Sequence, residues 1–200
     1  MRLISAAHAP ITDGIAMIEL DGLVRGARIV DDLLKAASVR IIASEVYSGP
    51  RHAVLFDGPL EDLGLAYDAG LAAGGDRVVD SVLLPAAQPS LVRALAGSFE
   101  APEQDDAAIL LVEFETIAST LRAVDAALKV APLNLSAWRL GQGIAGRALF
   151  ALRGEHANLE AARDEIEVVA GAALMEQQLI PRPDPLGLWA RPFGRGGSTP

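Results

Sequence analysis

The chain has 200 residues, 51% of them hydrophobic and only 4% aromatic, which predicts a core built from Ala, Val, Leu and Ile. Its net charge of −9 argues against a nucleic-acid partner, and the lack of cysteine excludes disulfides, thiol chemistry and cysteine-held iron–sulfur clusters. The apolar runs are too short for a membrane span or a secretory signal, so we expect a cytoplasmic protein.

The first half of the chain predicts the order β-α-β-β-α-β with a short closing helix. Apolar residues at helical spacing from Leu23 to Ala37 indicate an amphipathic helix. Gly49 and Pro50 predict a tight loop between the next two strands, and Pro59 can begin the second helix. The expected elements are strand 15–19, helix 23–37, strands 39–44 and 52–57, helix 59–73, strand 78–84 and helix 88–95.

The second half repeats this order after a polar, acidic segment that we interpret as a linker. We expect strand 108–113, helix 117–131, strands 134–140 and 147–152, helix 157–170 and strand 173–180. The predicted organisation is a first domain at 1–96 with a short N-terminal extension, a linker at 97–106, a second domain at 107–188 and a partly disordered tail at 189–200. The split βαβ order predicts an α+β fold, an α/β sandwich, made of two ferredoxin-like βαββαβ domains.

The two halves are copies of one another. The segment from Ile18-Glu19 to Lys35 recurs as Val112-Glu113 to Lys129 at a constant offset (129 − 35 = 94). Later the offset is 96, as between Gly58 and Gly154, so the second copy has two extra residues, which we expect just before its hairpin loop. A repeat of this length corresponds to a whole small domain. Modules of about 90 residues bury small cores, which favours packing against each other or oligomerisation.

One segment resembles a cofactor motif. The run Gly141-Gln142-Gly143-Ile144-Ala145-Gly146 is a literal G-x-G-x-x-G, a pattern that can hold a dinucleotide pyrophosphate at a helix N-terminus. Too few residues follow it for a crossover helix, and its equivalent in the first copy is a hairpin. We therefore interpret it as a hairpin loop in which backbones approach closely.

The titratable residues show no catalytic or metal-binding pattern. The histidines, His8, His52 and His156, share no helical spacing and lack a neighbouring cysteine or paired carboxylate. No serine lies in a nucleophile elbow, and the acidic residues are spread along predicted helix faces. We therefore expect no metal, no cofactor and no enzymatic activity.

Two pairs of basic residues occur in both copies. Lys35 and Lys129 lie near the ends of equivalent helices, where a cation favours the helix dipole. Arg51 and Arg147 directly follow the two hairpin loops (147 − 51 = 96). A solvated arginine at the start of a strand is the structural explanation for either of them alone.

Several segments together resemble the bacterial microcompartment shell domain. They are Ile18-Glu19, Asp32-Leu33-Leu34-Lys35-Ala36-Ala37 and Tyr47-Ser48-Gly49-Pro50 in the first copy, and Val112-Glu113, Ala123-Val124-Asp125-Ala126-Ala127-Leu128-Lys129-Val130-Ala131, Arg153-Gly154-Glu155 and Ile180-Pro181-Arg182-Pro183 in the second. The fused double domain is similar to the tandem class, in which three chains form a pseudohexameric disc that tiles into shell facets. The element order is that of the unpermuted single-domain proteins. The resemblance implies a location in the microcompartment shell within the cytoplasm, and it implies other shell proteins, hexameric and pentameric tiles, as partners.

The resemblance also implies roles for individual residues. It implies that the hairpin loops line a central pore, with Ser48, Gly49, Pro50 and Arg51 in the first copy and Ile144, Ala145, Gly146 and Arg147 in the second. It places Lys35, Lys129 and Arg182 at the tile edge, although the first copy has Pro85-Ala86-Ala87 and lacks the equivalent arginine. Three chains would bring six arginines near the channel (2 × 3 = 6), and we expect these to favour anionic metabolites. Without cysteine, we expect a redox-silent pore.

Two other hypotheses belong to different classes. A regulatory protein of two ferredoxin-like modules would bind a small metabolite between domains or subunits and be stabilised by it. An oxidoreductase would use the segment from Gly141 to Gly146 and bind a nicotinamide or a flavin. The shell hypothesis instead predicts a trimer that forms sheets or tubes at low salt.

Overall fold

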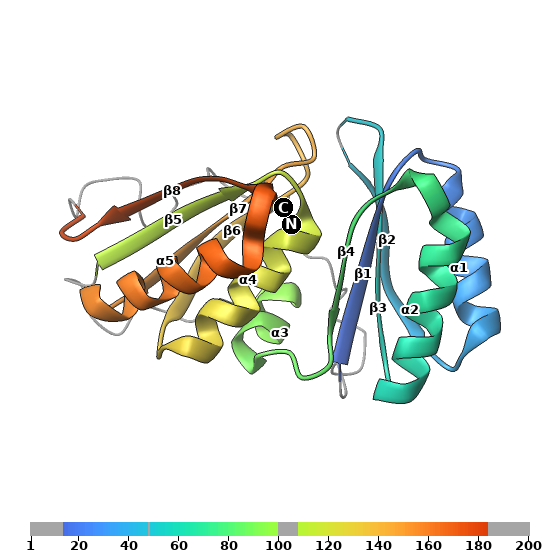
Figure 1. Ribbon diagram of the computed structural model, residues 1–200, viewed down its shortest axis with the longest axis horizontal. Coiled ribbons are helices and arrows are strands. Elements are labelled where there is room, and N and C mark those ends of the chain that lie inside the picture. The colour runs from blue at the N-terminus through green and yellow to red at the C-terminus, as the bar shows by residue number, and fades with distance from the viewer. Residues whose placement is uncertain (1–13, 48, 100–107, 184–200) are drawn as a thin grey trace, which may run out of the picture.

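The computed structural model describes residues 14–47, 49–99 and 108–183, which form two ferredoxin-like units side by side (Figure 1). The first unit contains β1 (Gly14–Asp21), α1 (Arg25–Ala36), β2 (Arg40–Tyr47), β3 (Arg51–Gly58), α2 (Leu60–Gly74), the 3-10 turn η1 (Gly75–Arg77), β4 (Val78–Leu84) and α3 (Pro89–Leu95). The second contains β5 (Ala108–Phe114), α4 (Ile117–Val130), β6 (Asn134–Leu140), β7 (Ala148–Gly154), α5 (His156–Ala170), η2 (Gly171–Ala173) and β8 (Leu174–Ile180). The predicted βαββαβ order is confirmed in both copies. A closing helix of the second copy would fall outside the described residues.

Each unit holds a four-stranded antiparallel sheet. The strand orders are β2-β3-β1-β4 and β6-β7-β5-β8, the order expected of a ferredoxin-like domain. The registers match across the duplication, because Glu19 lies opposite Asp80 and Glu113 lies opposite Glu176. In both sheets the register shifts directly after that glutamate. The two copies are therefore equivalent residue by residue, and offsets of 94 and 96 can be used to compare them.

The hairpin connections differ in length between the units. In the first unit the last pair is Tyr47 opposite Arg51, which leaves three residues in the connection (51 − 47 − 1 = 3), and the preceding pair, Val46 and His52, encloses five (52 − 46 − 1 = 5). Leu140 lies opposite Ala148, which leaves seven in the second (148 − 140 − 1 = 7). Val46 and His52 correspond to Leu140 and Ala148, so the two extra residues of the second copy lie between Leu140 and Ala148. The expected position, just before the loop residues 144–146, falls in this range.

The sheet of the first unit is covered on both faces. On one face, Ile18 and Leu20 pack with Ile29 of α1 in a cluster that also includes residues of α2. On the other face, Ile15 and Met17 belong to a cluster that extends into the second unit. An antiparallel sheet with one wet face would show polar residues at these alternate positions. The apolar run of β1 therefore reflects a sheet that packs against its own helices and against the second unit.

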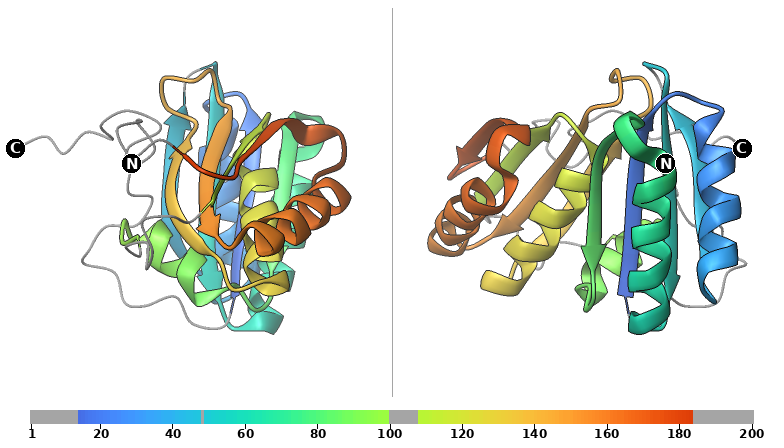
Figure 2. Two further views of the ribbon diagram at one scale, coloured as in Figure 1. Left: turned by 90° about the vertical axis from the view of Figure 1, so that its left-hand side faces the viewer. Right: turned by 45° about the vertical axis from the view of Figure 1, so that its right-hand side comes forward.

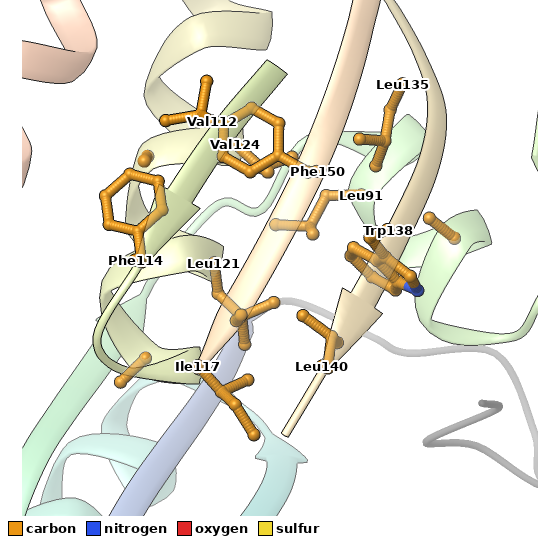
Figure 3. Packing of buried hydrophobic residues seen from close by; sticks show 14 of the residues in the cluster. Leu91, Val112, Phe114, Ile117, Leu121, Val124, Leu135, Trp138, Leu140 and Phe150 are labelled. Carbon is orange, nitrogen blue, oxygen red and sulfur yellow. The ribbon is translucent and has the colours of Figure 1, made fainter. Parts of the chain in front are cut away.

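Helix α4 lies between the two sheets (Figures 1 and 2). Figure 3 shows its residues Leu121 and Val124 in the cluster that also contains Phe150 of its own sheet. Leu91 of α3 and Trp138 of β6 belong to this cluster too, so the last helix of the first unit packs on the second. Burying one such leucine contributes about 1.5–3 kcal/mol, so this shared cluster holds the units together.

Candidate functional site

The two hairpin loops meet at one end of the molecule, here called the loop end (Figures 1 and 2). A Cβ added to Gly49 would lie 3.4 Å from the carbonyl oxygen of Ala145. A Cβ added to Gly141 would lie 2.5 Å from the Tyr47 ring, so only glycine fits beside that ring. The structure therefore brings together loop residues from both copies. Ser48, expected in the first loop, lies outside the described residues.

The second connection has a backbone shape that its glycines permit. Positive φ angles occur at Gly141 (71°), Gly143 (72°) and Gly146 (82°), and also at Ala145 (55°). The N–H of Gly141 donates to the carbonyl of Arg147 at 2.8 Å and closes the loop. The loop leads into β7, a strand, and therefore provides no helix N-terminus for a pyrophosphate. The glycine pattern is that of a hairpin loop.

Both arginines that follow the loops bind acidic residues. The Arg51 side chain is 19% exposed; its Nη1 donates to the backbone carbonyl of Glu115 at 3.3 Å and its Nη2 lies 3.9 Å from the carboxylate. Nη1 of Arg147 donates to the carboxylate of Glu113 at 3.0 Å. Arg51 thus connects the two units, whereas Arg147 stays within its own. Each guanidinium has a nearby negative charge that offsets part of its own.

A buried carboxyl group joins the two units below the loops. Glu19 is 1% exposed, and its Oε2 accepts a hydrogen bond from the backbone N–H of Ala118 at 2.7 Å. A side chain of the first unit therefore caps the first turn of α4 in the second. Burial raises the pKa of Glu19 to about 7, helped by the charge of Asp80 and opposed by the Ala118 bond and the charge of Arg51. Both protonation states are consequently populated near neutral pH.

Asp80 completes this cap from the neighbouring strand. Its Oδ2 accepts hydrogen bonds from the hydroxyls of Thr116 and Ser119, and its Oδ1 lies 3.4 Å from Nη2 of Arg122. Thr116 is also the N-cap of α4, since its hydroxyl accepts the Ser119 N–H at 3.2 Å. Burial would raise the pKa of Asp80, but the hydrogen bonds from Ser119 and Thr116 outweigh it and hold the pKa below its ordinary value. Near neutral pH Asp80 is therefore charged, whereas Glu19 is partly neutral.

The basic residues expected at a tile edge lie at the other end of the molecule, here called the far end. Helices α1 and α4 begin near the loop end and run away from it, so Lys35 and Lys129 in their last turns lie far from the loops. Each pairs with the aspartate four residues earlier, Asp31 at 2.6 Å and Asp125 at 2.5 Å. Arg182 is exposed and follows β8, whose end pairs with the start of β5 at the same far end.

The histidine in β3 has a structural role. Nδ1 of His52 lies 3.0 Å from the carbonyl oxygen of Leu23, so this nitrogen carries the proton, and Nε2 lies 2.7 Å from the Ser44 hydroxyl. A Cβ added to Gly26 would lie 2.2 Å from the ring, so the ring packs directly on α1. Within residues 14–47, 49–99 and 108–183, no group of three or more His, Cys, Asp or Glu side chains could hold a metal ion. No helix in those ranges is both long and apolar enough to cross a membrane.

The capping acids Glu19 and Asp80 are not among the site residues predicted from the sequence. Glu19 and Glu113 enter that prediction only as part of the repeated motif. The available signal was an acidic residue inside an otherwise apolar strand, present in both copies and opposite a second acid, Asp80 or Glu176. A charge in such a strand needs a partner, and here the partner is a helix start.

Two ferredoxin-like units fused in tandem, with their hairpin loops together and basic residues at the far end, define a double-domain α+β structural protein. The chain belongs to the bacterial microcompartment (BMC) domain family, whose model matches residues 14–87 and again residues 108–183. It is a structural protein of the microcompartment shell, and its location is that shell, within the bacterial cytoplasm.

Individual relatives agree with this assignment. The chain is 25% identical over 175 residues to the bacterial microcompartment shell protein PduT of Citrobacter freundii. The aligned region covers 86% of this chain and 94% of that protein. A solved microcompartment protein from Desulfitobacterium hafniense DCB superposes with a TM-score of 0.72 at 26% identity, over 86% of this chain and 95% of the other. The double-ringed trimeric shell protein of the RMM microcompartment shares the fold, with a TM-score of 0.61 at 20% identity over 86% and 91%.

These comparisons confirm the expected family and the tandem, unpermuted fold. The relatives are structural shell proteins, and the alternative of a metabolite-binding regulatory protein is not favoured.

Proposed function

We propose that three copies of this chain close into a pseudohexameric shell tile with a central pore, and that the tile is not an enzyme. The observation that carries this proposal is the pairing of the loops of Gly49 and Ala145 at one end of the chain. A head-to-tail ring of three chains gathers six such loops around one axis (2 × 3 = 6). The trimeric shell protein with the same fold supports this number of chains. The proposed domain limits, 1–96 and 107–188, enclose the two family matches.

The loops would line the pore of the tile. The proposed lining residues are Ser48, Gly49, Pro50 and Arg51 from the first unit and Ile144, Ala145, Gly146 and Arg147 from the second. The pore would pass small metabolites, and its arginines would favour anions, because charged groups focus the potential in a narrow channel. Glu115 and Glu113 bind these arginines and reduce the net positive charge. The expected preference is therefore weaker than six unpaired guanidinium groups would produce.

The far end of each unit would form the rim that meets neighbouring tiles. Lys35, Lys129 and Arg182 are the proposed rim residues, and the neighbours are further copies and other shell proteins, hexameric and pentameric tiles. An exposed ion pair contributes only about 0–1 kcal/mol, so tiling depends on shape and on repetition around the disc. The first unit has Ala86 where the second has Arg182, which makes alternate rim contacts unequal.

Two measurements on the purified full-length chain test the proposal. Multi-angle light scattering should give a mass near three chains (3 × 20.9 = 62.7 kDa), and negative-stain images at low salt should show sheets or tubes. A variant with Lys35→Ala and Lys129→Ala should keep the trimeric mass and lose the sheets. A chain that stays monomeric at high concentration would overturn the proposal.

A further inference from the structure

We infer that the contact between neighbouring chains in the ring has the same geometry as the contact between the two units of one chain. The residues differ, because exposed charged side chains occupy positions that are buried in the contact within the chain. In this contact, Arg25 and Arg28 of α1 in one copy meet Glu113 and Glu176 on the second sheet of another copy. The inference rests on the proposed trimer and specifies which residues close it. The partner is a second copy of this chain.

The contact within the chain is the template. It joins unlike surfaces: the sheet of the first unit, with Glu19 and Asp80, and the start of α4 in the second unit. Because the contact joins a sheet surface of one unit to a helix start of the other, the two-unit chain keeps one unused sheet surface and one unused helix start at its two ends. The unused sheet belongs to the second unit and the unused helix is α1. They can be satisfied together only by another copy.

The unused sheet surface carries an acidic pair that lacks a cation on one side. Glu113 and Glu176 lie directly opposite each other on β5 and β8, as Glu19 and Asp80 do on β1 and β4. Like charges in directly opposite positions destabilise a sheet unless other groups compensate. Arg147 binds Glu113, but the described partner of the Glu176 carboxylate is only the side-chain amide of Gln178, at 3.0 Å. A cation beside Glu176 would complete the surface.

The unused helix surface exposes apolar residues at its start. Leu23 is 46% exposed and Val24 is 85% exposed. Their equivalents, at an offset of 94, are Ile117 and Ala118, which are completely buried, with the N–H of Ala118 bonded to Glu19 of the first unit. The first turn of α1 also lacks a side-chain cap, whereas the first turn of α4 is capped by Thr116. The start of α1 is therefore shaped for the same kind of contact that α4 makes.

The charges on α1 match the acidic pair. Arg25 is equivalent to Ser119, whose hydroxyl donates to Asp80. Arg28 is equivalent to Arg122, which forms an ion pair with the same aspartate. Asp80 itself corresponds to Glu176. Superposing the template therefore brings both arginines to the acidic pair on the sheet of the next copy. In the single chain Arg28 is solvent-exposed and binds Asp32 at 2.7 Å, a pair that the incoming carboxylate would replace or share.

The two kinds of contact in one ring then differ in chemistry. The contact within the chain has Arg122 beside the partly buried Asp80 and Arg51 on Glu115. It is closed by the buried Glu19 and the shared apolar cluster. The contact between chains has two exposed arginines facing two acids. Because salt screens exposed charges far more than buried ones, the ring opens between chains as ionic strength rises. The units within each chain remain together.

Charge reversal at this contact tests the inference by light scattering. Arg28→Glu and Glu176→Arg should each shift the mass from trimer to monomer, with the apparent dissociation constant raised at least about tenfold, because each places like charges together. The chain that carries both changes restores opposite charges at every contact and should again be trimeric. Arg163→Glu, an exposed arginine on α5, is the matched control and should leave the mass unchanged.

An equimolar mixture of the two single variants provides a sharper test. A three-membered ring has an odd number of contacts, so two variants cannot alternate around it without one mismatch. The mixture should therefore form open pairs and no closed trimers, in contrast to the doubly changed chain. A salt series on the unchanged chain, from about 50 mM to about 500 mM so that the Debye length shortens severalfold, should show dissociation without unfolding by circular dichroism.

The outcomes separate this inference from the proposed function. An unchanged chain that is monomeric at low salt overturns the trimeric tile and with it this contact. An unchanged chain that is trimeric while both single variants also remain trimeric overturns the contact alone. If the single variants lose their fold, the salt series decides: a trimer that persists unchanged to 500 mM salt contradicts a contact held by exposed charges.

Discussion

The carboxyl of Glu19 in the first unit accepts a hydrogen bond from the backbone N–H of Ala118 in the second, at 2.7 Å and across 99 residues of chain. This bond crosses the contact between the units at the start of α4. With Asp80 it supplies acceptors for the amides and hydroxyls of that first turn. The stability of one unit is therefore coupled to the other, and changes at this contact should affect the unfolding of both.

Replacing Glu19 by Gln should remove a pH dependence of stability. The pKa of Glu19 is raised from 4.5 to about 7 in the folded chain, so folding favours the neutral carboxyl. That stabilisation is complete below pH 4.5 and is lost as pH rises through 7. The shift corresponds to about 3 kcal/mol. Urea unfolding at pH 5 and pH 9 should show Glu19→Gln close to the unchanged chain at pH 5 and more stable at pH 9. Equal behaviour of both chains at the two pH values would contradict this account.

Replacing Asp80 by Ala should weaken the contact between units at neutral pH. The change removes acceptors for Thr116, Ser119 and Arg122 and leaves these donors at a partly buried surface. Unsatisfied donors of this kind cost about 1–3 kcal/mol each, with part recovered by water. Thermal unfolding should show a lower midpoint, whereas Asp76→Ala, at an exposed position in η1, should change it little. An unchanged midpoint for the Asp80 variant would show that the cap does not contribute to the stability of the chain.

Much of the fold could be predicted from the sequence because its signals are local. The spacing of apolar residues locates α1, and the two glutamates at equivalent positions align the sheets. Contacts between the units leave no local pattern. That Tyr47 packs on Gly141, and that Arg51 reaches Glu115, follows from how the units are oriented.

Replacing Gly141 by Ala should disturb the loop end more than the same change at Gly143. Both glycines have positive φ, 71° and 72°, so both substitutions cost about 1–2 kcal/mol of backbone strain. Only the Cβ at position 141 would also meet the Tyr47 ring, at 2.5 Å; at position 143 the nearest atom, at 2.9 Å, is the end of the flexible Arg139 side chain. The ring contact should add about 1–3 kcal/mol. Urea unfolding of the two variants measures the difference, and equal losses would mean that the loops do not press on each other.

Reversing the charge of the two loop arginines should separate their roles. Arg51 is 19% exposed and bridges the units through Glu115, so Arg51→Glu should mainly lower the unfolding midpoint. The Arg147 side chain is 48% exposed, so Arg147→Glu should mainly reduce the passage of anions, by several-fold at low salt, because exposed charge at a constriction acts on the permeant ion.

Flux of a small anion and of a neutral solute of the same size through reconstituted shells provides the measurement, with Arg163→Glu on α5 as the control for net charge. The anion flux should fall with Arg147→Glu, and further when Arg51→Glu is added, while the neutral flux stays constant. If anion flux is the same with both arginines reversed, the loops do not set the charge preference of a pore. If neutral flux falls equally, the change has closed the opening instead of altering its charge.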